Sequence, residues 1–122
     1  MSICVILCWW KMGKVNLLVK YCLINKENEY NIKGILINKE LKFLDNNNIM
    51  ILNLGNNTLK RITKDSKILF DFNKNECIIL DDKNNTISFN INVLEFIKND
   101  NYFYVKYCIV QEEVFEIMIK IL

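Results

Sequence analysis

The chain has 122 residues and a formal net charge of +2, with its lysines interspersed among aspartates and glutamates. This length suits one domain, and a hydrophobic content of 52% supplies a continuous core and argues against general disorder. Nucleic-acid binders usually have a larger and more clustered basic excess, so nucleic-acid binding is not indicated. The chain contains no histidine, which excludes Ser-His-Asp, Cys-His and histidine-metal chemistry.

The composition is biased toward isoleucine, asparagine and lysine, as in proteins of A/T-rich genomes, so single lysines and asparagines carry little functional information. The five cysteines form no CxxC pair, and no histidine is present to complete a mixed zinc site. We therefore expect buried or half-buried free thiols, a reducing cytoplasmic location and no metal site. The glycines stand alone, outside any GxGxxG or GxxxxGK[ST] motif, so no phosphate-binding loop or cofactor is expected.

The N-terminal segment differs from the rest of the chain. Residues 3–10 form an apolar run that is shorter than the ~20 residues that span a bilayer, so no transmembrane segment is predicted. The run lacks the basic start and the small-residue cleavage site of a secretory signal. We expect residues 1–11 to be an upstream extension that is not part of the natural product, with Met12 as its start. An added barrel strand and a membrane-surface contact through Trp9 and Trp10 are the alternatives.

After Met12, apolar and polar residues alternate with a period of two, which is typical of β-strands with one buried face. Turn residues rich in Asn, Asp and Gly interrupt this alternation about every eight to twelve residues. The predicted strands are residues 15–23, 29–38, 41–44, 49–54, 58–62, 68–72, 77–80, 86–93, 103–109 and 115–121. Residues 94–97 continue or bend the strand before them, and one helical turn over residues 93–97 is the alternative. Gly34 inside its strand predicts a bulge or a sharp bend.

These elements predict an all-β protein with a single domain over residues 12–122. The short hairpins favour one antiparallel meander, and an open meander would leave edge strands that invite aggregation. We therefore expect the sheet to close into a barrel of about eight to ten strands rather than to form an open sandwich. Such a barrel is either filled by side chains or holds one small ligand.

The acidic side chains give no catalytic candidate. The pairs at residues 81–82 and 112–113 lie in predicted turns, where solvated charge is the expected role. Asp71 alternates with Phe70 and Phe72 and is therefore expected on the opposite face of its strand. We assign no catalytic residue, and the sequence leans against an enzyme.

Arg61 is the most informative polar side chain, because the chain otherwise uses lysine. If Leu59 points into the core, Arg61 does too, and a buried guanidinium needs a carboxylate or a ligand as partner. If Ile62 is the core residue instead, Arg61 is exposed, and an exposed or structurally paired arginine is the favoured interpretation. The candidate ligand-binding residues are Arg61, Phe70, Phe72 and Tyr107, although aromatic stripes of this kind are more often core.

Several features follow one another along nearly the whole chain. They are the strand that leads to Gly34, the stretches 58–62 and 68–72, the strand at 86–91, and the closing hairpin at 107–121. In this order they resemble the YwiB-like family of small bacterial proteins. The resemblance implies a calycin-type, lipocalin-like barrel, related in shape to ligand-binding barrels and without an established activity. It carries over no functional residue beyond Arg61 as a candidate.

Several functions suit such a barrel, and fold-level analogy ranks them only loosely. The first is a cytoplasmic, non-enzymatic protein that binds a small apolar or amphipathic ligand at one barrel end. The second is a protein-interaction module, such as a homodimer that pairs through an edge strand or the apolar N-terminal run. The third is an OB-like nucleic-acid binder, which the strand number and the modest charge disfavour. An enzyme that uses carboxylates alone is the last.

Overall fold

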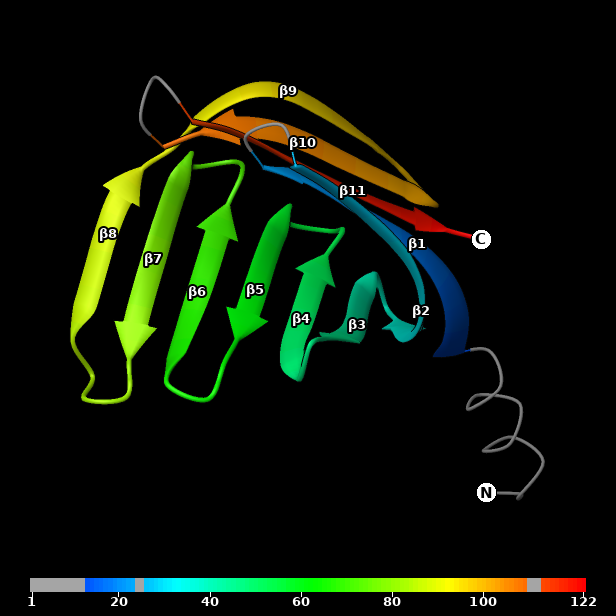
Figure 1. Cartoon of the computed structure of the whole chain (residues 1–122), viewed down its shortest axis with the longest axis horizontal. Coiled ribbons are helices and arrows are strands. Elements are labelled where there is room, and N and C mark those ends of the chain that lie inside the picture. The colour runs from blue at the N-terminus through cyan, green and yellow to red at the C-terminus, as the bar shows by residue number, and fades with distance from the viewer. Residues whose placement is uncertain (1–12, 24–25, 110–112) are drawn as a thin grey trace.

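The computed structural model describes residues 13–23, 26–109 and 113–122. Eleven antiparallel strands form a single sheet (Figure 1). The strands are β1 (Lys14–Leu23), β2 (Lys26–Ile37), β3 (Glu40–Asp45), β4 (Asn48–Asn53), β5 (Thr58–Ile62), β6 (Ser66–Asp71), β7 (Glu76–Asp81), β8 (Thr86–Asn90), β9 (Asn92–Asn99), β10 (Tyr102–Cys108) and β11 (Val114–Ile121). The predicted all-β class is confirmed, and the strand count slightly exceeds the eight to ten that the alternation indicated.

The strands follow one another as a meander that is nearly closed into a barrel. The order in the sheet is β8-β7-β6-β5-β4-β3-β2-β1-β11-β10-β9, so the first and last strands of the chain pair with each other. The two edges of the sheet are β8 and β9, which only Ile91 separates in sequence. The predicted antiparallel meander is therefore confirmed, and its gap lies within the chain rather than between the terminal strands.

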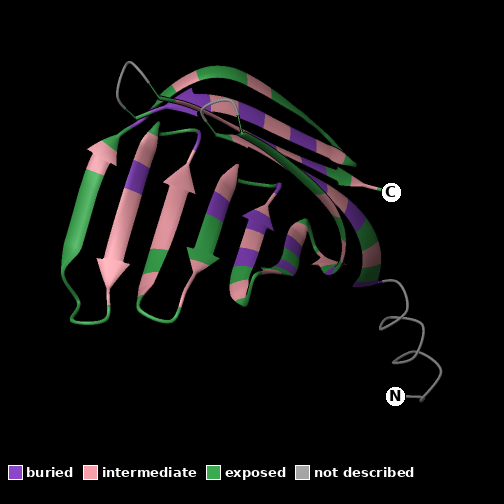
Figure 2. Ribbon diagram, in the orientation of Figure 1, coloured by how far each residue is buried: buried purple, intermediate pink, exposed green. Residues whose placement is uncertain are grey.

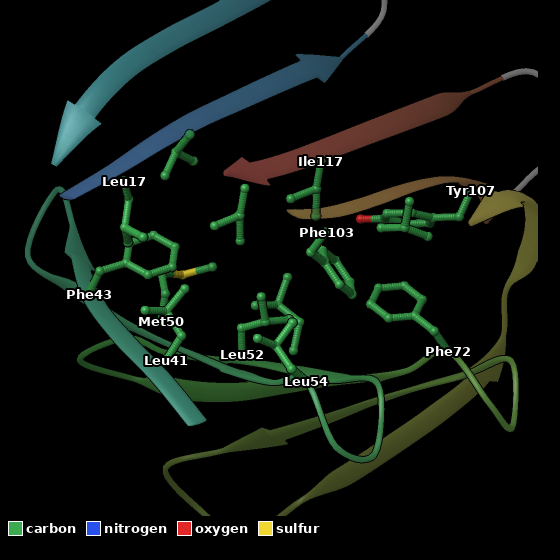
Figure 3. Close-up of a cluster of buried hydrophobic side chains, with 14 of the residues drawn as sticks. Leu17, Leu41, Phe43, Met50, Leu52, Leu54, Phe72, Phe103, Tyr107 and Ile117 are labelled. Atoms are coloured by element: carbon green, nitrogen blue, oxygen red, sulfur yellow. The ribbon is translucent and has the colours of Figure 1, made fainter. Parts of the chain in front are cut away.

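The sheet curves until its two halves face each other, with β3 to β8 opposite β9, β10, β11, β1 and β2 (Figure 1). Alternation decides which side chains lie between the halves, and buried residues alternate with less buried ones along β1, β3, β4 and β10 (Figure 2). In β10, for example, Phe103, Val105 and Tyr107 are buried. Leu17 from β1 and Leu41 from β3 meet them in a core that both halves supply (Figure 3).

Strand β2 changes partners at Gly34. Residues 26–35 of β2 pair with β1, whereas only Gly34–Ile37 pair with β3. The pairing with β1 continues through Gly34 without a register shift, so the expected bulge is absent, and β2 instead curves smoothly across the sheet (Figure 1). Glycine fits this position because an added Cβ would lie 2.9 Å from both the Lys42 carbonyl oxygen and Leu17 Cδ1. Residues 26–33 of β2, which precede Gly34, pair with β1 only, and no described strand pairs with their other edge.

The stretch predicted as one long strand over residues 86–97 is two strands, β8 and β9. The buried Ile91 lies at the break, and its backbone N–H donates to the carbonyl of Asn75 in the turn between β6 and β7. The alternative of a helical turn at residues 93–97 is wrong, because these residues belong to β9. A β-bulge lies in β9: the pairing of β9 with β10 shifts register between Lys106 and Tyr107, and Leu94 is the extra residue.

Candidate functional site

A cavity of about 850 Å³ opens between the two halves of the sheet. Small-molecule sites typically enclose about 300–1,000 Å³. The cavity lies where β2 has separated from β3: Asn28, Glu29, Tyr30 and Ile32 of β2 line one side, and the β3–β4 hairpin at residues 44–46 lines the other. Residues of β1, β4, β5, β6, β10 and β11, together with Ile109, complete the lining. We call this space the interlayer cavity.

The walls of the interlayer cavity are mostly apolar and aromatic. Met50, Leu59 and Ile117 line it and are themselves buried. Tyr107 contributes an aromatic wall, because its ring centroid lies 5.4 Å from that of Phe70 and 5.3 Å from that of Phe115. Such walls favour an apolar ligand, since transferring each methylene group from water is worth about 0.8 kcal/mol.

Arg61 is the charged member of an otherwise apolar row on the inner face of β3 to β8. The strand register sets the following side chains next to one another: Phe43, Met50, Arg61, Ile68, Ile79 and Ile87. Leu59, two residues before Arg61 on the same face, is only 1% exposed. Alternation therefore turns Arg61 inward, yet its position at the mouth of the cavity leaves it exposed to solvent. The sequence presented inward orientation and exposure as alternatives, and the structure combines them.

Arg61 has no protein partner among the residues that the structure describes. The two ion pairs found there join Lys20 to Glu27 and Lys42 to Glu40. No described side chain accepts a hydrogen bond from the guanidinium, and Asp45, the acidic side chain on the inner face of β3, forms no ion pair with it. The five N–H donors of Arg61 are therefore open to solvent or to a ligand.

Two tyrosine hydroxyls are buried in the cavity without a hydrogen-bond partner. Tyr21 of β1 and Tyr30 of β2 have ring centroids 6.0 Å apart, and their hydroxyl oxygens make no hydrogen bond within the protein. Burial raises the pKa of Tyr21 to about 12 and also raises the pKa of Tyr30. Both hydroxyls are therefore protonated near neutral pH and are able to donate.

Electrostatic effects relate these hydroxyls to Asp45 and Arg61. The negative charge of Asp45 further raises the pKa of Tyr21 and of Tyr30, although these contacts lack hydrogen-bonding geometry. Burial is the main cause of the raised pKa of Tyr107, and the positive charge of Arg61 acts in the opposite direction there and at Tyr21. Arg61 from one half of the sheet therefore lies within electrostatic reach of two tyrosines from the other half.

The structure places three of the four predicted site residues, Arg61, Phe70 and Tyr107, around the interlayer cavity. Phe72 does not line it. Its ring is buried in the core, stacked on Phe70 at a centroid distance of 6.0 Å and packed against Phe103 at 5.8 Å. Phe72 therefore packs against Phe70 from the side of the core.

Sequence reasoning missed Tyr21, Tyr30 and Asp45. The two tyrosines sit on apolar faces and were indistinguishable from core residues, and Asp45 adjoins an asparagine-rich turn. The signal was available in the alternation of β3, which puts Asp45 on the same face as Leu41 and Phe43. An acidic residue on a core-facing side is the pattern that indicates a site.

Asp71 and Asp81, to which no catalytic role was assigned, stabilise turns. Asp71 Oδ1 accepts a hydrogen bond from the backbone N–H of Asn73, and Asp81 Oδ1 accepts one from that of Asn85. The backbone N–H of Asn85 is the main cause of the lowered pKa of Asp81. These contacts agree with solvated charge in turns, while Glu112 lies outside the described residues.

The three described cysteines, Cys22, Cys77 and Cys108, are free thiols, as expected. Burial raises the pKa of Cys77 to about 11, so this thiol is protonated and unreactive near neutral pH. Within residues 13–23, 26–109 and 113–122, no three Cys, Asp or Glu side chains are grouped to hold a metal ion. Cys4, Cys8 and the whole of residues 1–11 lie outside the described residues.

No family model, curated protein or solved structure matches the chain. The resemblance to the YwiB-like family, with its calycin-type barrel, therefore stays a prediction. In the part of the chain that the structure describes, no helix is long and apolar enough to cross a membrane. The interlayer cavity is therefore the feature of the molecule that bears on function.

Proposed function

We propose that the protein is a non-enzymatic, cytoplasmic binding protein that holds one small apolar or amphipathic ligand in the interlayer cavity. The observation that carries this proposal is the cavity itself: about 850 Å³ with apolar walls and a few polar groups near its mouth. The free thiols of Cys77 and Cys108 support a reducing compartment.

The polar groups of the cavity favour binding over catalysis. A general base works best with a pKa near the working pH, whereas Tyr21 and Tyr30 have raised pKa values and stay protonated. The chain has no histidine to act in their place. These groups are suited to orienting a ligand by hydrogen bonds.

A cavity-filling substitution tests the proposal. Ile32→Trp places an indole on the cavity lining, whereas Ile35→Trp places it on the opposite, exposed face of the same strand. We expect the unmodified protein and the Ile35→Trp variant to bind the neutral apolar dye Nile red, measured by its fluorescence, and the Ile32→Trp variant to bind it at least tenfold more weakly. Circular dichroism checks that both variants fold. Equal binding by the two variants would contradict a site in this cavity.

A second candidate function, self-association through an edge strand, is favoured by β8. The edge of β8 away from β7 is unpaired in the sheet, and Thr86–Asn90 carries none of the charged or proline residues that usually protect edge strands. Ile87 on this strand is 61% exposed. Light scattering tests this candidate: a dimer that Ile87→Lys dissociates and Leu44→Lys leaves intact would support it, and a monomeric unmodified protein would exclude it.

A further inference from the structure

We infer that the ligand is an amphiphile with a single carboxylate head group, which Arg61 binds at the mouth of the interlayer cavity while the apolar tail extends inward past Leu59 and Phe70. This inference rests on the proposed function and adds the chemical class of the ligand. Three features of the cavity carry it: the unpaired guanidinium, the donors opposite it and the burial of Leu59 next to Arg61 on the inner face of β5.

The first feature is the unusual surrounding of Arg61. Its cross-strand neighbours on the inner face, Met50 and Ile68, are apolar, and no described carboxylate pairs with it. A guanidinium presents a planar fork of N–H donors that matches the two oxygens of a carboxylate. An acceptor brought by the ligand would satisfy donors that the described protein groups leave open.

The second feature is the set of hydroxyls across the cavity. Tyr21 and Tyr107 extend from the opposite half of the sheet and lie within electrostatic reach of Arg61. The buried Tyr21 hydroxyl has no acceptor within the protein. Arg61, Tyr21 and Tyr107 line the same cavity, so donors from both halves of the sheet border one volume, as expected where an anion is held.

Asp45 limits the charge of the ligand. Two further carboxylates, Glu29 and Glu116, line the cavity from the outer faces of β2 and β11, so Asp45 is the carboxylate that strand alternation turns to the inner face beside it. Asp45 lies near the protonated hydroxyl of Tyr30. Asp45 thus has the Tyr30 hydroxyl close by, whereas Arg61 has no acceptor among the described residues. An anionic head group is therefore favoured over a cationic one, and the nearby negative charge disfavours a dianion such as a phosphate monoester.

The position of Arg61 along its strand sets the orientation of the ligand. Arg61 is exposed, while Leu59 is fully enclosed on the same face. Leu59 is paired with Phe70 on β6, and both line the cavity. A head group at Arg61 thus stays close to water, and a tail that continues along the inner face reaches the dry part of the cavity.

Isothermal titration calorimetry of the full chain with three ten-carbon probes tests the inference. The probes are decanoate, decanol and decyltrimethylammonium, all kept below their micelle concentrations. We expect decanoate to bind about tenfold or more tightly than decanol, as one charge-assisted hydrogen bond provides. Arg61→Gln should remove this preference and leave decanol binding unchanged. Lys60→Gln, which removes the same charge from the opposite, exposed face of β5, should retain the preference.

The possible outcomes separate the inference from the proposed function. Equal binding of decanoate and decanol, or a preference that survives in Arg61→Gln, overturns the inference and leaves the proposed function standing. Tighter binding of decyltrimethylammonium than of decanoate also overturns it, as does tighter binding of decyl phosphate in a separate titration. Failure of all three probes to bind the unmodified protein overturns both. Arg61→Lys, which keeps the charge but not the fork, should show an intermediate preference.

Discussion

Replacement of Gly34 by alanine should destabilise the fold through one crowded contact. The new Cβ would lie 2.9 Å from the Lys42 carbonyl oxygen and 2.9 Å from Leu17 Cδ1, whereas carbon atoms pack comfortably at about 3.5–4.0 Å. The terminal methyl of Leu17 can rotate away. The Lys42 carbonyl belongs to the backbone of β3, which is held in register with Ile35 of β2, so relieving this contact requires moving a strand.

The expected size of the effect follows from two opposing contributions. Overpacking of this kind costs about 1–3 kcal/mol. Alanine also reduces the conformational entropy of the unfolded chain, which returns about 0.4–1 kcal/mol. We therefore expect Gly34→Ala to lower the free energy of unfolding by about 1–2 kcal/mol.

Urea unfolding followed by circular dichroism measures this difference, with Gly13→Ala as the matched control. At Gly13 an added Cβ would meet its nearest atom, Ile35 Cγ2, at 3.5 Å, an ordinary contact. The control should therefore be as stable as the unmodified protein or slightly more stable. If Gly34→Ala unfolds at the same urea concentration as the control, β3 does not approach Gly34 closely enough to exclude a Cβ atom.

Three further substitutions test the core, the cavity and the contact that joins the two halves. Phe103→Ala should lower the free energy of unfolding by about 3–5 kcal/mol in urea titrations, because this ring is only 1% exposed. Burial raises the pKa of Tyr21 to about 12. The stabilisation that the protonated Tyr21 hydroxyl contributes is therefore complete below pH ~10 and is lost as the pH rises through about 12. Tyr21→Phe should flatten the pH dependence of the free energy of unfolding in that window. Lys98→Met should cost about 1 kcal/mol in the same urea assay, because Lys98 Nζ donates to the Leu54 carbonyl and to Asn57 Oδ1, each at 2.7 Å.

Each of these three predictions has a result that would contradict it. Phe103→Ala must be compared with Leu94→Ala, where 49% exposure predicts a change within about 0.5 kcal/mol, and equal losses would refute the core assignment. For Tyr21→Phe, an unchanged alkaline profile would show that Tyr21 ionises as in the unfolded chain. Lys60→Met controls for the loss of a surface lysine, and it should not reproduce the effect of Lys98→Met.

The alternation of the sequence was sufficient to predict the strands and their faces but not the boundary between β8 and β9. Residues 86–97 read as one continuing strand because alternation describes only which side a residue faces. The break at Ile91 depends on tertiary contacts, since Ile91 is buried and its N–H is satisfied by Asn75 from another turn. The closing pairs between β1 and β11 are equally non-local, from Leu17↔Ile121 to Leu23↔Phe115.

The candidate site was partly predictable, because Arg61 is an arginine in a chain that otherwise uses lysine and because it shares a strand face with the apolar Leu59. Its exposure was not predictable, because exposure depends on where the opposite half of the sheet ends. Tyr21 and Tyr30 were missed for a related reason. A tyrosine on an apolar face has the same sequence pattern whether its hydroxyl is paired in the core or directed into a cavity, and the two cases differ only in the strands that face it.

The existence of the interlayer cavity follows from a mismatch in length between neighbouring strands. Strand β2 has 12 residues and β3 has six. The chain reverses directly after β3 at Asn46 and Asn47, whose φ angles of 48° and 71° are those of a tight two-residue hairpin turn. This turn ends β3 at Asp45, so the first part of β2 has no strand of equal length to pair with and continues along β1 alone. The asparagines that at first reflected only a compositional bias therefore have a structural consequence: by reversing the chain early, they leave open the space that Asp45 and Arg61 of one half of the sheet share with Tyr21 of the other.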